Sequence, residues 1–426
     1  MQSIYLDHNA TTPTRPEVVE AMSRCYTEIY ANPASGHRPG QQARQALEDA
    51  RERIAQVLDA DLAPPRRDRL LFTSGGTEAN NLAILGIARA RNASLPSNTE
   101  NQPGQIIISS GEHQSVIEPA EHLLEQGWRL DTLGLTPQGV VRVDQLPPLL
   151  NAAMPRLVSV LLGNHETGVL QPIGELAAIC NRAGIPLHTD AVQVVGKLPV
   201  SFRTLGVAAM SVTAHKFQGP LGIGALLLRD GVPLAPLMFG GHQQSGLRPG
   251  TESAALAVGM ATALDLWQRE RDEYAQRVRS LRDRFEAGLR AGMPDIVVHG
   301  AAAGAPGGQT FLSASLSASL SGPGQTRMSA PPIQPDPRLP QTSNIAFPGF
   351  DGQILLMALD LAGVACSVGS ACSSGSTELS PTLRAMDLPS SLVASSLRFS
   401  FGATTTEAEI DEAVRRIVHV CRELRG

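Results

Sequence analysis

The sequence predicts an α/β protein whose core is a parallel β-sheet covered by helices. Short apolar runs of strand length alternate with helical stretches; they occupy residues 69–74, 105–110, 157–162, 185–190 and 207–213. Runs that are apolar on both faces are typical of strands in a covered parallel sheet. The alternation predicts right-handed crossovers, and such sheets bind ligands at the carboxyl ends of their strands.

The chain length predicts two domains, because 426 residues exceed what one hydrophobic core supports. We expect a large domain at residues 13–265 and a smaller α/β domain made of residues 1–12 and 266–426. A long helical pattern at residues 254–291 leads out of the large domain. Residues 301–341 are rich in Ala, Gly, Ser, Pro and Gln, which predicts a flexible surface insertion; a binding loop is the alternative.

The composition disfavours several classes of protein. The hydrophobic share of 42% suits a globular core, and a net charge of -5 without a dense basic block disfavours nucleic-acid and membrane partners. We see no secretory signal and no apolar run of membrane-spanning length. The five cysteines are scattered and form no Cys-x-x-Cys pair, which disfavours a disulfide framework and a zinc site. We therefore expect a reduced, cytoplasmic protein without a metal.

The end of the first apolar run carries a Gly-rich turn. Residues 69–73 lead into a Ser-Gly-Gly-Thr sequence that includes Gly76 and Thr77, and a helical pattern follows. Glycines allow backbone N–H groups to approach an anion closely, and the amino terminus of a helix favours negative charge. The turn therefore suits a phosphate group, although an ordinary strand-to-helix turn with a Thr cap is the alternative.

Three further strand ends carry side chains that could take part in catalysis. His113 could stack on a flat ring and move protons, Asp190 could pair with a protonated pyridine nitrogen, and Lys216 could form a Schiff base with an aldehyde. Each has a simpler reading: a structural histidine, a helix-capping aspartate and a solvated loop lysine. Together with the phosphate turn, they match the parts that pyridoxal 5'-phosphate needs.

Over nearly its whole length the sequence resembles a known family through motifs that occur in the family's order. The motifs are Tyr5-Leu-Asp-His-Asn-Ala-Thr-Thr-Pro13, Asn32-Pro-Ala-Ser-Gly-His37, Phe72-Thr-Ser-Gly-Gly-Thr-Glu-Ala-Asn-Asn81, Gly111-Glu-His113, Asn164-His-Glu-Thr-Gly168, His188-Thr-Asp190, Ala214-His-Lys216, Arg248-Pro-Gly-Thr251 and Gly369-Ser-Ala-Cys-Ser-Ser-Gly375. The chain resembles NifS-like cysteine desulfurases, in the class V aminotransferase branch of pyridoxal-phosphate enzymes of fold type I. This resemblance implies a large cofactor-binding domain with a mixed, mostly parallel sheet and a smaller carboxyl-terminal α/β domain.

The resemblance also implies residue roles. Contacts to the cofactor are implied for Gly76, Thr77, His113, His165, Asp190, Gln193, Thr213, His215, Lys216 and Thr251. Lys216 and His113 would be catalytic, and Asn32 and Arg398 would bind the substrate carboxylate. Thr251 would reach the phosphate of a neighbouring subunit, which implies a homodimer. His165 departs from the Asn often found at its position, and the 301–341 insertion exceeds the family's short link.

Cys372 is the candidate sulfur acceptor. Seven of residues 367–376 are Ser or Gly, which predicts a mobile segment able to collect sulfur in a pocket and deliver it outside. A thiolate is the reactive form, and a transient iron–sulfur contact could also form at this thiol. The simpler reading is a surface thiol without a role. Cys366 reads as a buried strand residue, and a disulfide between Cys366 and Cys372 is a further alternative.

The resemblance implies that the chain converts L-cysteine to L-alanine and carries the sulfur as a persulfide on Cys372. The acceptor would be an iron–sulfur scaffold protein or a tRNA-thiolation enzyme. Selenocysteine lyase is the nearest alternative, because it uses the same fold and cofactor. An aminotransferase of the same branch, which needs no thiol, and a catalytically idle sulfur-binding module are the others.

Overall fold

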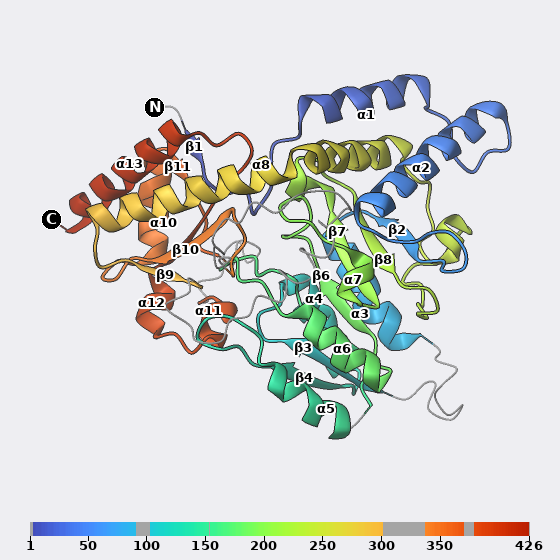
Figure 1. The fold of residues 1–426 in the computed structure, drawn as a ribbon, viewed down its shortest axis with the longest axis horizontal. Helices are drawn as coiled ribbons and strands as arrows, with labels where there is room; N and C mark the ends of the chain where they lie inside the picture. Colours follow the sequence, from blue (N-terminus) through green and yellow to red (C-terminus); the bar gives the residue numbers. More distant parts are fainter. Residues whose placement is uncertain (1–2, 91–102, 153, 301–336, 370–378, 426) are drawn as a thin grey trace, which may run out of the picture.

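A seven-stranded sheet with the strand order β2-β8-β7-β6-β5-β3-β4 forms the larger part of the protein (Figure 1). This computed structural model describes residues 3–90, 103–152, 154–300, 337–369 and 379–425. The strands are β2 (Arg69–Thr73), β3 (Gln105–Ser109), β4 (Arg129–Leu133), β5 (Leu157–Ser159), β6 (Leu187–Asp190), β7 (Ala209–Thr213) and β8 (Gly224–Leu228). Only β8 is antiparallel to its neighbours, which confirms the predicted mixed, mostly parallel sheet.

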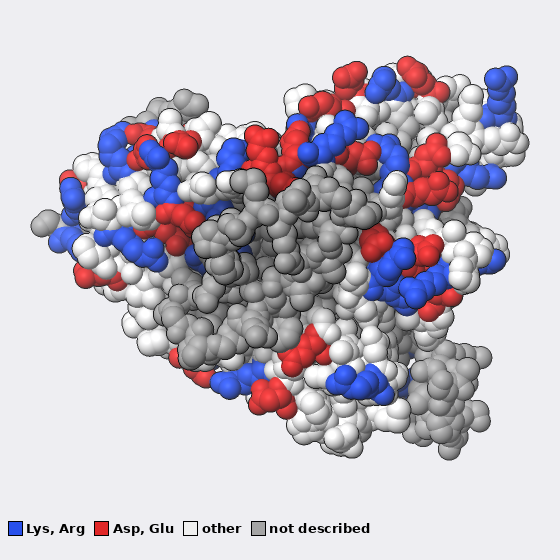
Figure 2. Space-filling view, viewed as in Figure 1, with Lys and Arg blue, Asp and Glu red and all other residues white. Residues whose placement is uncertain are grey.

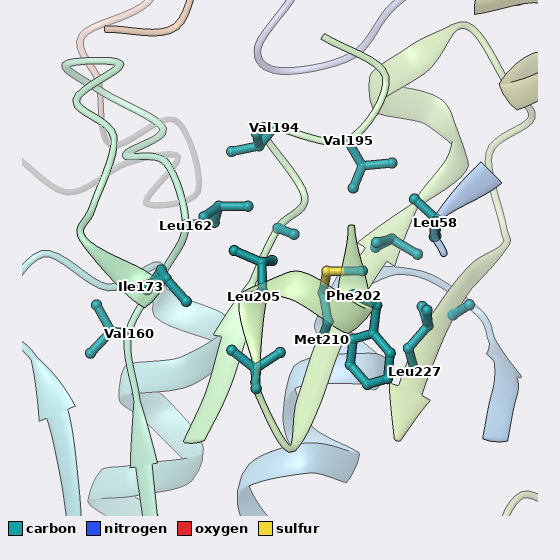
Figure 3. Close-up of a cluster of buried hydrophobic side chains, with 14 of the residues drawn as sticks. Leu58, Val160, Leu162, Ile173, Val194, Val195, Phe202, Leu205, Met210 and Leu227 are labelled. Atoms are coloured by element: carbon teal, nitrogen blue, oxygen red, sulfur yellow. The ribbon is translucent and has the colours of Figure 1, made fainter. Parts of the chain in front are cut away.

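Helices cover both faces of this sheet. They are α1 (Pro16–Glu28), α2 (Arg38–Val57), α3 (Gly76–Arg89), α4 (Gln114–Glu125), α5 (Leu146–Ala152), α6 (Ile173–Ala183) and α7 (Phe202–Leu205). Successive residues of β8 show why its apolar run is continuous: Leu227 packs in the cluster of Figure 3 with Met210 and Phe202, whereas Leu226 packs in a separate cluster with Ile84. Each predicted apolar run contains a strand.

A smaller lobe lies at the other end of the molecule, together with both chain termini (Figure 1). Its antiparallel sheet has the order β12-β10-β9, and a short parallel pair joins β1 to β11. The elements are β1 (Ile4–Tyr5), β9 (Val297–His299), β10 (Thr342–Ala346), β11 (Val364–Ala365), β12 (Ser396–Ser400), α10 (Gly352–Leu361), α11 (Pro381–Ala385), α12 (Ser390–Ala394) and α13 (Glu407–Arg425). Phe285 and Phe399 pack in its core with ring centroids 4.9 Å apart.

The long helix α8 (Ala254–Gly292) connects the two parts (Figure 1). Its residue Trp267 packs in the core beside the large sheet, whereas Val278 packs in the core of the smaller lobe. The apolar face of one continuous helix is thus shared between two hydrophobic cores. We propose that the boundary between a large domain of residues 13–265 and the remaining small domain falls within this helix.

The expectation of a surface insertion at residues 301–341 is wrong for its final residues. Leu339 and Gln341 are fully buried, and Arg338 forms a buried ion pair with Glu286 at 2.8 Å. The interpretation failed there because a Pro- and Gln-rich composition does not reveal a buried partner more than fifty residues away. Residues 301–336 lie outside the described part of the chain.

Charged side chains of both signs alternate over the face shown in Figure 2 rather than gathering by sign. On the described part of that face, this distribution gives no broad basic surface for a polyanion to bind. Within the described residues, no helix combines the length and the apolar character needed to cross a bilayer. No cluster of three or more potential metal-ligating side chains occurs among the described residues either.

Gly224 illustrates how the fold shapes the strand ends. It begins β8 and lies between Thr73 and Thr213 of the neighbouring strands. A Cβ atom at this position would lie 2.7 Å from the carbonyl carbon of Gly75 and 2.7 Å from the Val212 oxygen. Only glycine therefore allows the turn between β2 and α3 to fold against the sheet at this point.

We predict that Gly224→Ala destabilises the protein by about 1–3 kcal/mol, the usual result of forcing a methyl group against a packed backbone. Urea unfolding measures the change. Gly174→Ala in α6 is the matched control, because a Cβ there meets no atom within 4 Å; it should stabilise the helix by up to about 1 kcal/mol. Equal unfolding midpoints for the two variants would contradict the prediction.

Candidate active site

A cavity of about 380 Å³ lies at the carboxyl ends of the parallel strands. Its walls come from the segments that follow β2, β3, β6 and β7, and from β12 of the smaller lobe. Predicted site residues that line it are Gly76, Thr77, His113, His165, Asp190, Gln193, Thr213, His215, Lys216 and Arg398. The volume lies in the range of about 300–1,000 Å³ that is typical of small-molecule sites.

One end of the cavity is the amino terminus of α3. The helix begins at Gly76, directly after the turn that ends β2, so Gly76 and Thr77 place the first N–H groups of a 14-residue helix at the cavity. A Cβ on Gly76 would lie 3.0 Å from Val192 Cγ2 and 3.7 Å from the Thr213 side chain. Unbonded N–H groups and the helix dipole make this end of the cavity suitable for an anion such as phosphate.

Asp190 lies at the end of β6, with its carboxylate held by two donors. Asn80 Nδ2 donates to Asp190 Oδ2 at 2.7 Å, and the backbone N–H of Val192 donates to Oδ1 at 2.9 Å. His188, two residues before Asp190 in β6, is fully buried between the hydroxyls of Ser159 and Ser211, and burial lowers its pKa to about 3. A neutral His188 therefore supports the strand without adding a charge beside Asp190.

His113 lies at the N-cap of α4, with its ring at the cavity wall. Its Nδ1 accepts the backbone N–H of Ser115 at 3.1 Å and lies 2.8 Å from Ser115 Oγ. The ring of His165 meets that of His113 edge to face, with centroids 5.2 Å apart. Burial lowers the pKa of His165 well below its usual value, so His165 is neutral, and its Nδ1 contacts no partner among the described residues.

Lys216 lies in a short 3-10 turn, Ala214–Phe217, directly after β7. Its Nζ donates to the backbone oxygens of Asn9, at 2.5 Å, and Ala10, at 2.8 Å. The chain has one other lysine, Lys197, whose buried Nζ donates to the backbone oxygen of Lys216. Burial, and secondly the charge of Lys216, lower the pKa of Lys197 to about 7. The same two causes, with Lys197 as a third, lower the pKa of the neighbouring His215 to about 4.

Arg398 extends from β12 of the smaller lobe into the cavity wall and is 3% exposed. Its Nη2 donates to Asp7 Oδ1 at 2.8 Å, and its Nη1 donates to the His165 backbone oxygen at 3.1 Å. The Nε atom contacts no partner among the described residues. Arg398 is therefore a buried guanidinium with donor capacity left for an anionic group.

Glu112 and Asn80 also line the cavity, although sequence reasoning did not select them. Glu112 is buried; its Oε1 accepts from Ser109 Oγ at 2.5 Å and from the Leu161 N–H at 2.8 Å, while Oε2 has no partner among the described residues. Burial raises the pKa of this carboxyl to about 8. The signal that could have found both residues is their position inside matched motifs, next to His113 and just after Thr77.

Three predicted residues are not brought to the cavity in the described part of this chain. Asn32 is exposed and caps its own loop by accepting the Ala34 N–H at 2.9 Å. Thr251 is also exposed, in the segment between the 3-10 turn Gln243–Gly246 and the start of α8. Cys372 lies outside the described residues, although Gly369 and Pro381 on either side of its segment line the cavity.

The raised pKa of Glu112 predicts a specific dependence of stability on pH. The folded carboxyl keeps its proton up to about pH 8, whereas an ordinary carboxyl loses it near pH 4.5. The folded state therefore binds more protons between these values, and the Glu112 contribution to the free energy of unfolding falls as pH rises, by at most about 1.4 kcal/mol per pH unit.

We expect Glu112→Gln to remove this loss, because glutamine stays neutral and its oxygen accepts the same two hydrogen bonds. Urea unfolding of both proteins between about pH 5 and pH 8 measures the effect. The wild type should lose stability relative to the variant as pH rises. Parallel stability curves would show that Glu112 is ionised in the folded protein.

Comparison with known proteins agrees with this geometry. The chain matches the aminotransferase class-V family over residues 4–308 and 307–413. It is 37% identical to cysteine desulfurase IscS of Dictyoglomus turgidum, over 100% of this chain and 96% of that protein. It is 35% identical to cysteine desulfurase NifS of Azotobacter vinelandii, over 100% and 94%.

The solved structures that resemble this fold belong to the same group. A NifS-like protein from Rickettsia africae superposes with a TM-score of 0.81 at 26% identity, over 99% of this chain and 100% of that one. Another NifS-like protein gives a TM-score of 0.80 at 28% identity, with the same coverage. The predicted fold type is thereby confirmed. The chain belongs to the aminotransferase class-V family, in its group of NifS-like cysteine desulfurases.

Proposed function

We propose that this protein is a pyridoxal-phosphate-dependent cysteine desulfurase, which converts L-cysteine to L-alanine and transfers the sulfur to Cys372. The observation that carries the proposal is the convergence of an anion-binding helix terminus, a carboxylate, an imidazole and a lysine on one cavity. These groups come from four different strand ends. A buried arginine from the other lobe, Arg398, also lines the same cavity.

The residues at the cavity fit the cofactor. Buried polar atoms without a partner among the described residues, including Gln193 Oε1 and His165 Nδ1, are left for a polar ligand. Gly76, Thr77, Thr213 and His215 would hold the phosphate, Asp190 the ring nitrogen, His113 the ring face and Lys216 the aldehyde carbon. Bound there, pyridoxal phosphate would supply an electron sink for the carbon atoms of the substrate.

The substrate carboxylate would bind Arg398; Asn32, to which the resemblance assigns the same carboxylate, is exposed and does not line the cavity in this chain. A planar guanidinium can donate two parallel hydrogen bonds to a carboxylate, which orients the amino acid as well as binding it. The existing bonds from Arg398 to Asp7 and to the His165 carbonyl hold the guanidinium in place before substrate arrives. Lys216 would then remove the proton from the α-carbon of the substrate, and His113 would serve as a second acid and base.

Cys372 would receive the sulfur. Its thiolate attacks the substrate sulfur, a bond forms between the two sulfur atoms, and the bond between Cβ and sulfur breaks with its electron pair left on the substrate carbon. Protonation of that carbon completes alanine. Cys372 follows Gly369 of the cavity wall by three positions in the sequence, so covalent geometry keeps their Cα atoms within about 11 Å of each other. That distance allows the thiol to reach the cavity.

The finer features of the proposal follow from the resemblance to the family. The enzyme would act in the cytoplasm as a homodimer, with Thr251 reaching the phosphate of the neighbouring subunit. The persulfide would pass to an iron–sulfur scaffold protein or a tRNA-thiolation enzyme, and a transient iron–sulfur contact could form at Cys372. One solved relative, SspA, which is 25% identical with a TM-score of 0.70, has a structure in complex with cysteine.

We predict that L-cysteine adds about 32 Da, the mass of one sulfur, to the peptide that contains Cys372. Mass spectrometry of the alkylated, digested enzyme measures this addition, and Cys372→Ala should abolish both the addition and the release of sulfide. Cys366→Ala is the matched control, because burial raises the pKa of the Cys366 thiol and makes it unreactive.

Sulfur on the Cys366 peptide, or an unchanged rate of sulfide release from Cys372→Ala, would contradict the assignment of Cys372. The same pair of proteins distinguishes the alternative substrate. A selenocysteine lyase would release selenide from L-selenocysteine at a much higher rate than sulfide from L-cysteine, and pyruvate formation without sulfide would identify an aminotransferase.

Arg398→Lys should raise KM for L-cysteine by about 10- to 100-fold with a smaller change in kcat, because a lysine loses the second parallel hydrogen bond to the carboxylate. Steady-state kinetics measures both constants. Arg415→Lys, at an exposed position on α13, is the control and should leave them unchanged. A fall in kcat alone would show that Arg398 does not bind the substrate.

A further inference from the structure

A continuous chain of hydrogen bonds joins Asp190 to His113 through two residues that have no role so far. Asn80, on α3, donates from Nδ2 to Asp190 Oδ2 at 2.7 Å and to Ser115 Oγ at 2.8 Å. Ser115 Oγ in turn lies 2.8 Å from His113 Nδ1. Asn80 and Ser115 are 1% and 7% exposed, so water does not compete for these bonds.

The direction of each bond follows from the donors present. A carboxylate only accepts hydrogen bonds, so the Asn80 amide must present its NH2 group to Asp190, which fixes the amide orientation. That same nitrogen can only donate to Ser115 Oγ. The single hydrogen of the Ser115 hydroxyl is then left for its other close neighbour, His113 Nδ1.

His113 Nδ1 therefore accepts hydrogen bonds and carries no hydrogen of its own. It accepts the Ser115 hydroxyl at 2.8 Å, and it also accepts the Ser115 backbone N–H at 3.1 Å, a group that can only donate. A neutral imidazole with an accepting Nδ1 carries its hydrogen on Nε2. The N–H group of His113 thus lies on the ring edge opposite Ser115.

We propose that Asn80 and Ser115 are positioning residues that lock His113 in the tautomer with its hydrogen on Nε2 and tie that tautomer to the placement of the Asp190 carboxylate. This inference rests on the proposed roles of His113 and Asp190 at the cofactor. It gives neutral His113 a hydrogen-bond donor at Nε2, on the ring edge opposite Ser115, while Nδ1 stays occupied by Ser115.

The test is the tautomer of His113, read by nitrogen-15 NMR of the cofactor-loaded enzyme. Labelled histidine gives signals from ten residues, and loss of one set in His113→Gln assigns His113. The wild type should show a hydrogen on Nε2 and none on Nδ1. Ser115→Ala loses the hydroxyl donor to Nδ1 but keeps the backbone N–H donor, so its Nδ1 signal should shift and the share of the tautomer with a hydrogen on Nδ1 should rise. Ser115→Thr, which keeps a hydroxyl, should retain the wild-type pattern.

Kinetics supply a second readout. Ser115→Ala should lower kcat by about 2- to 10-fold, the range expected for one hydrogen bond, and Asn80→Ala, which removes two, by about 10- to 100-fold, each with little change in KM. Ser110→Ala and Asn81→Ala are matched controls. Their side chains donate to the Leu133 and Thr77 backbone oxygens, outside the chain of bonds, so neither change should alter kcat or the His113 signals.

A hydrogen on Nδ1 of His113 in the wild type would overturn the inference, as would His113 signals that are identical in the wild type, Ser115→Ala and Asn80→Ala. Unfolded variants are recognised by their thermal melting curves, and the wild-type NMR result stands without them. The proposed function fails separately: a missing persulfide on Cys372 with the tautomer intact would refute the desulfurase chemistry and leave the hydrogen-bond chain in place.

Discussion

The site depends on Asn9, which binds both lobes of the protein at once. Its N–H donates to Ser400 Oγ at 2.8 Å and its side chain donates to Thr342 Oγ1 at 2.9 Å, which ties it to two strands of the smaller sheet. Its backbone oxygen accepts Lys216 Nζ at 2.5 Å and Gln193 Nε2 at 3.0 Å from the large sheet. These contacts place the amine of Lys216 and the guanidinium of Arg398 on one cavity.

Burial determines the charges around that cavity. Desolvation keeps His165 and His215 neutral near neutral pH, and it favours the protonated form of Glu112. Asp190 and Arg398 differ from these three residues because specific hydrogen-bond partners hold them. Asp190 receives two donors. The resulting environment has one carboxylate where a ring nitrogen would be protonated and one guanidinium where a carboxylate would bind, and these are the charges that an amino-acid reaction on this cofactor requires.

Much of this arrangement could be predicted because it is local in sequence. Lys216 and Asp190 lie at the ends of apolar strand runs, and Gly76 begins a helix after a glycine turn. The pattern that predicts each strand end therefore stands next to the functional residue in the sequence. Asn80 could not be selected by that logic, since it lies inside a helix and acts through an inward-facing amide. Its partners Ser115 and Asp190 are 35 and 110 residues away in the sequence.

Distance along the chain also explains the other gaps. Asn9 meets Thr342 across 333 residues, and residues 337–341 are buried by contacts such as Arg338 with Glu286, none of which leaves a periodic pattern. For Lys216, the sequence is compatible both with a solvated loop lysine and with a cofactor-binding one. For His113, it is compatible both with a structural histidine and with a catalytic one. What separates the readings is convergence on one cavity, a property of the tertiary structure.

The most direct test is to identify the amine that holds the cofactor. Borohydride reduction of the loaded enzyme joins the cofactor permanently to that amine, and peptide mapping can locate it without ambiguity because the chain has only two lysines. The cofactor should be found on Lys216. Labelling of Lys197, or recovery of both lysine peptides unmodified from an enzyme that retains the cofactor, would contradict the central claim.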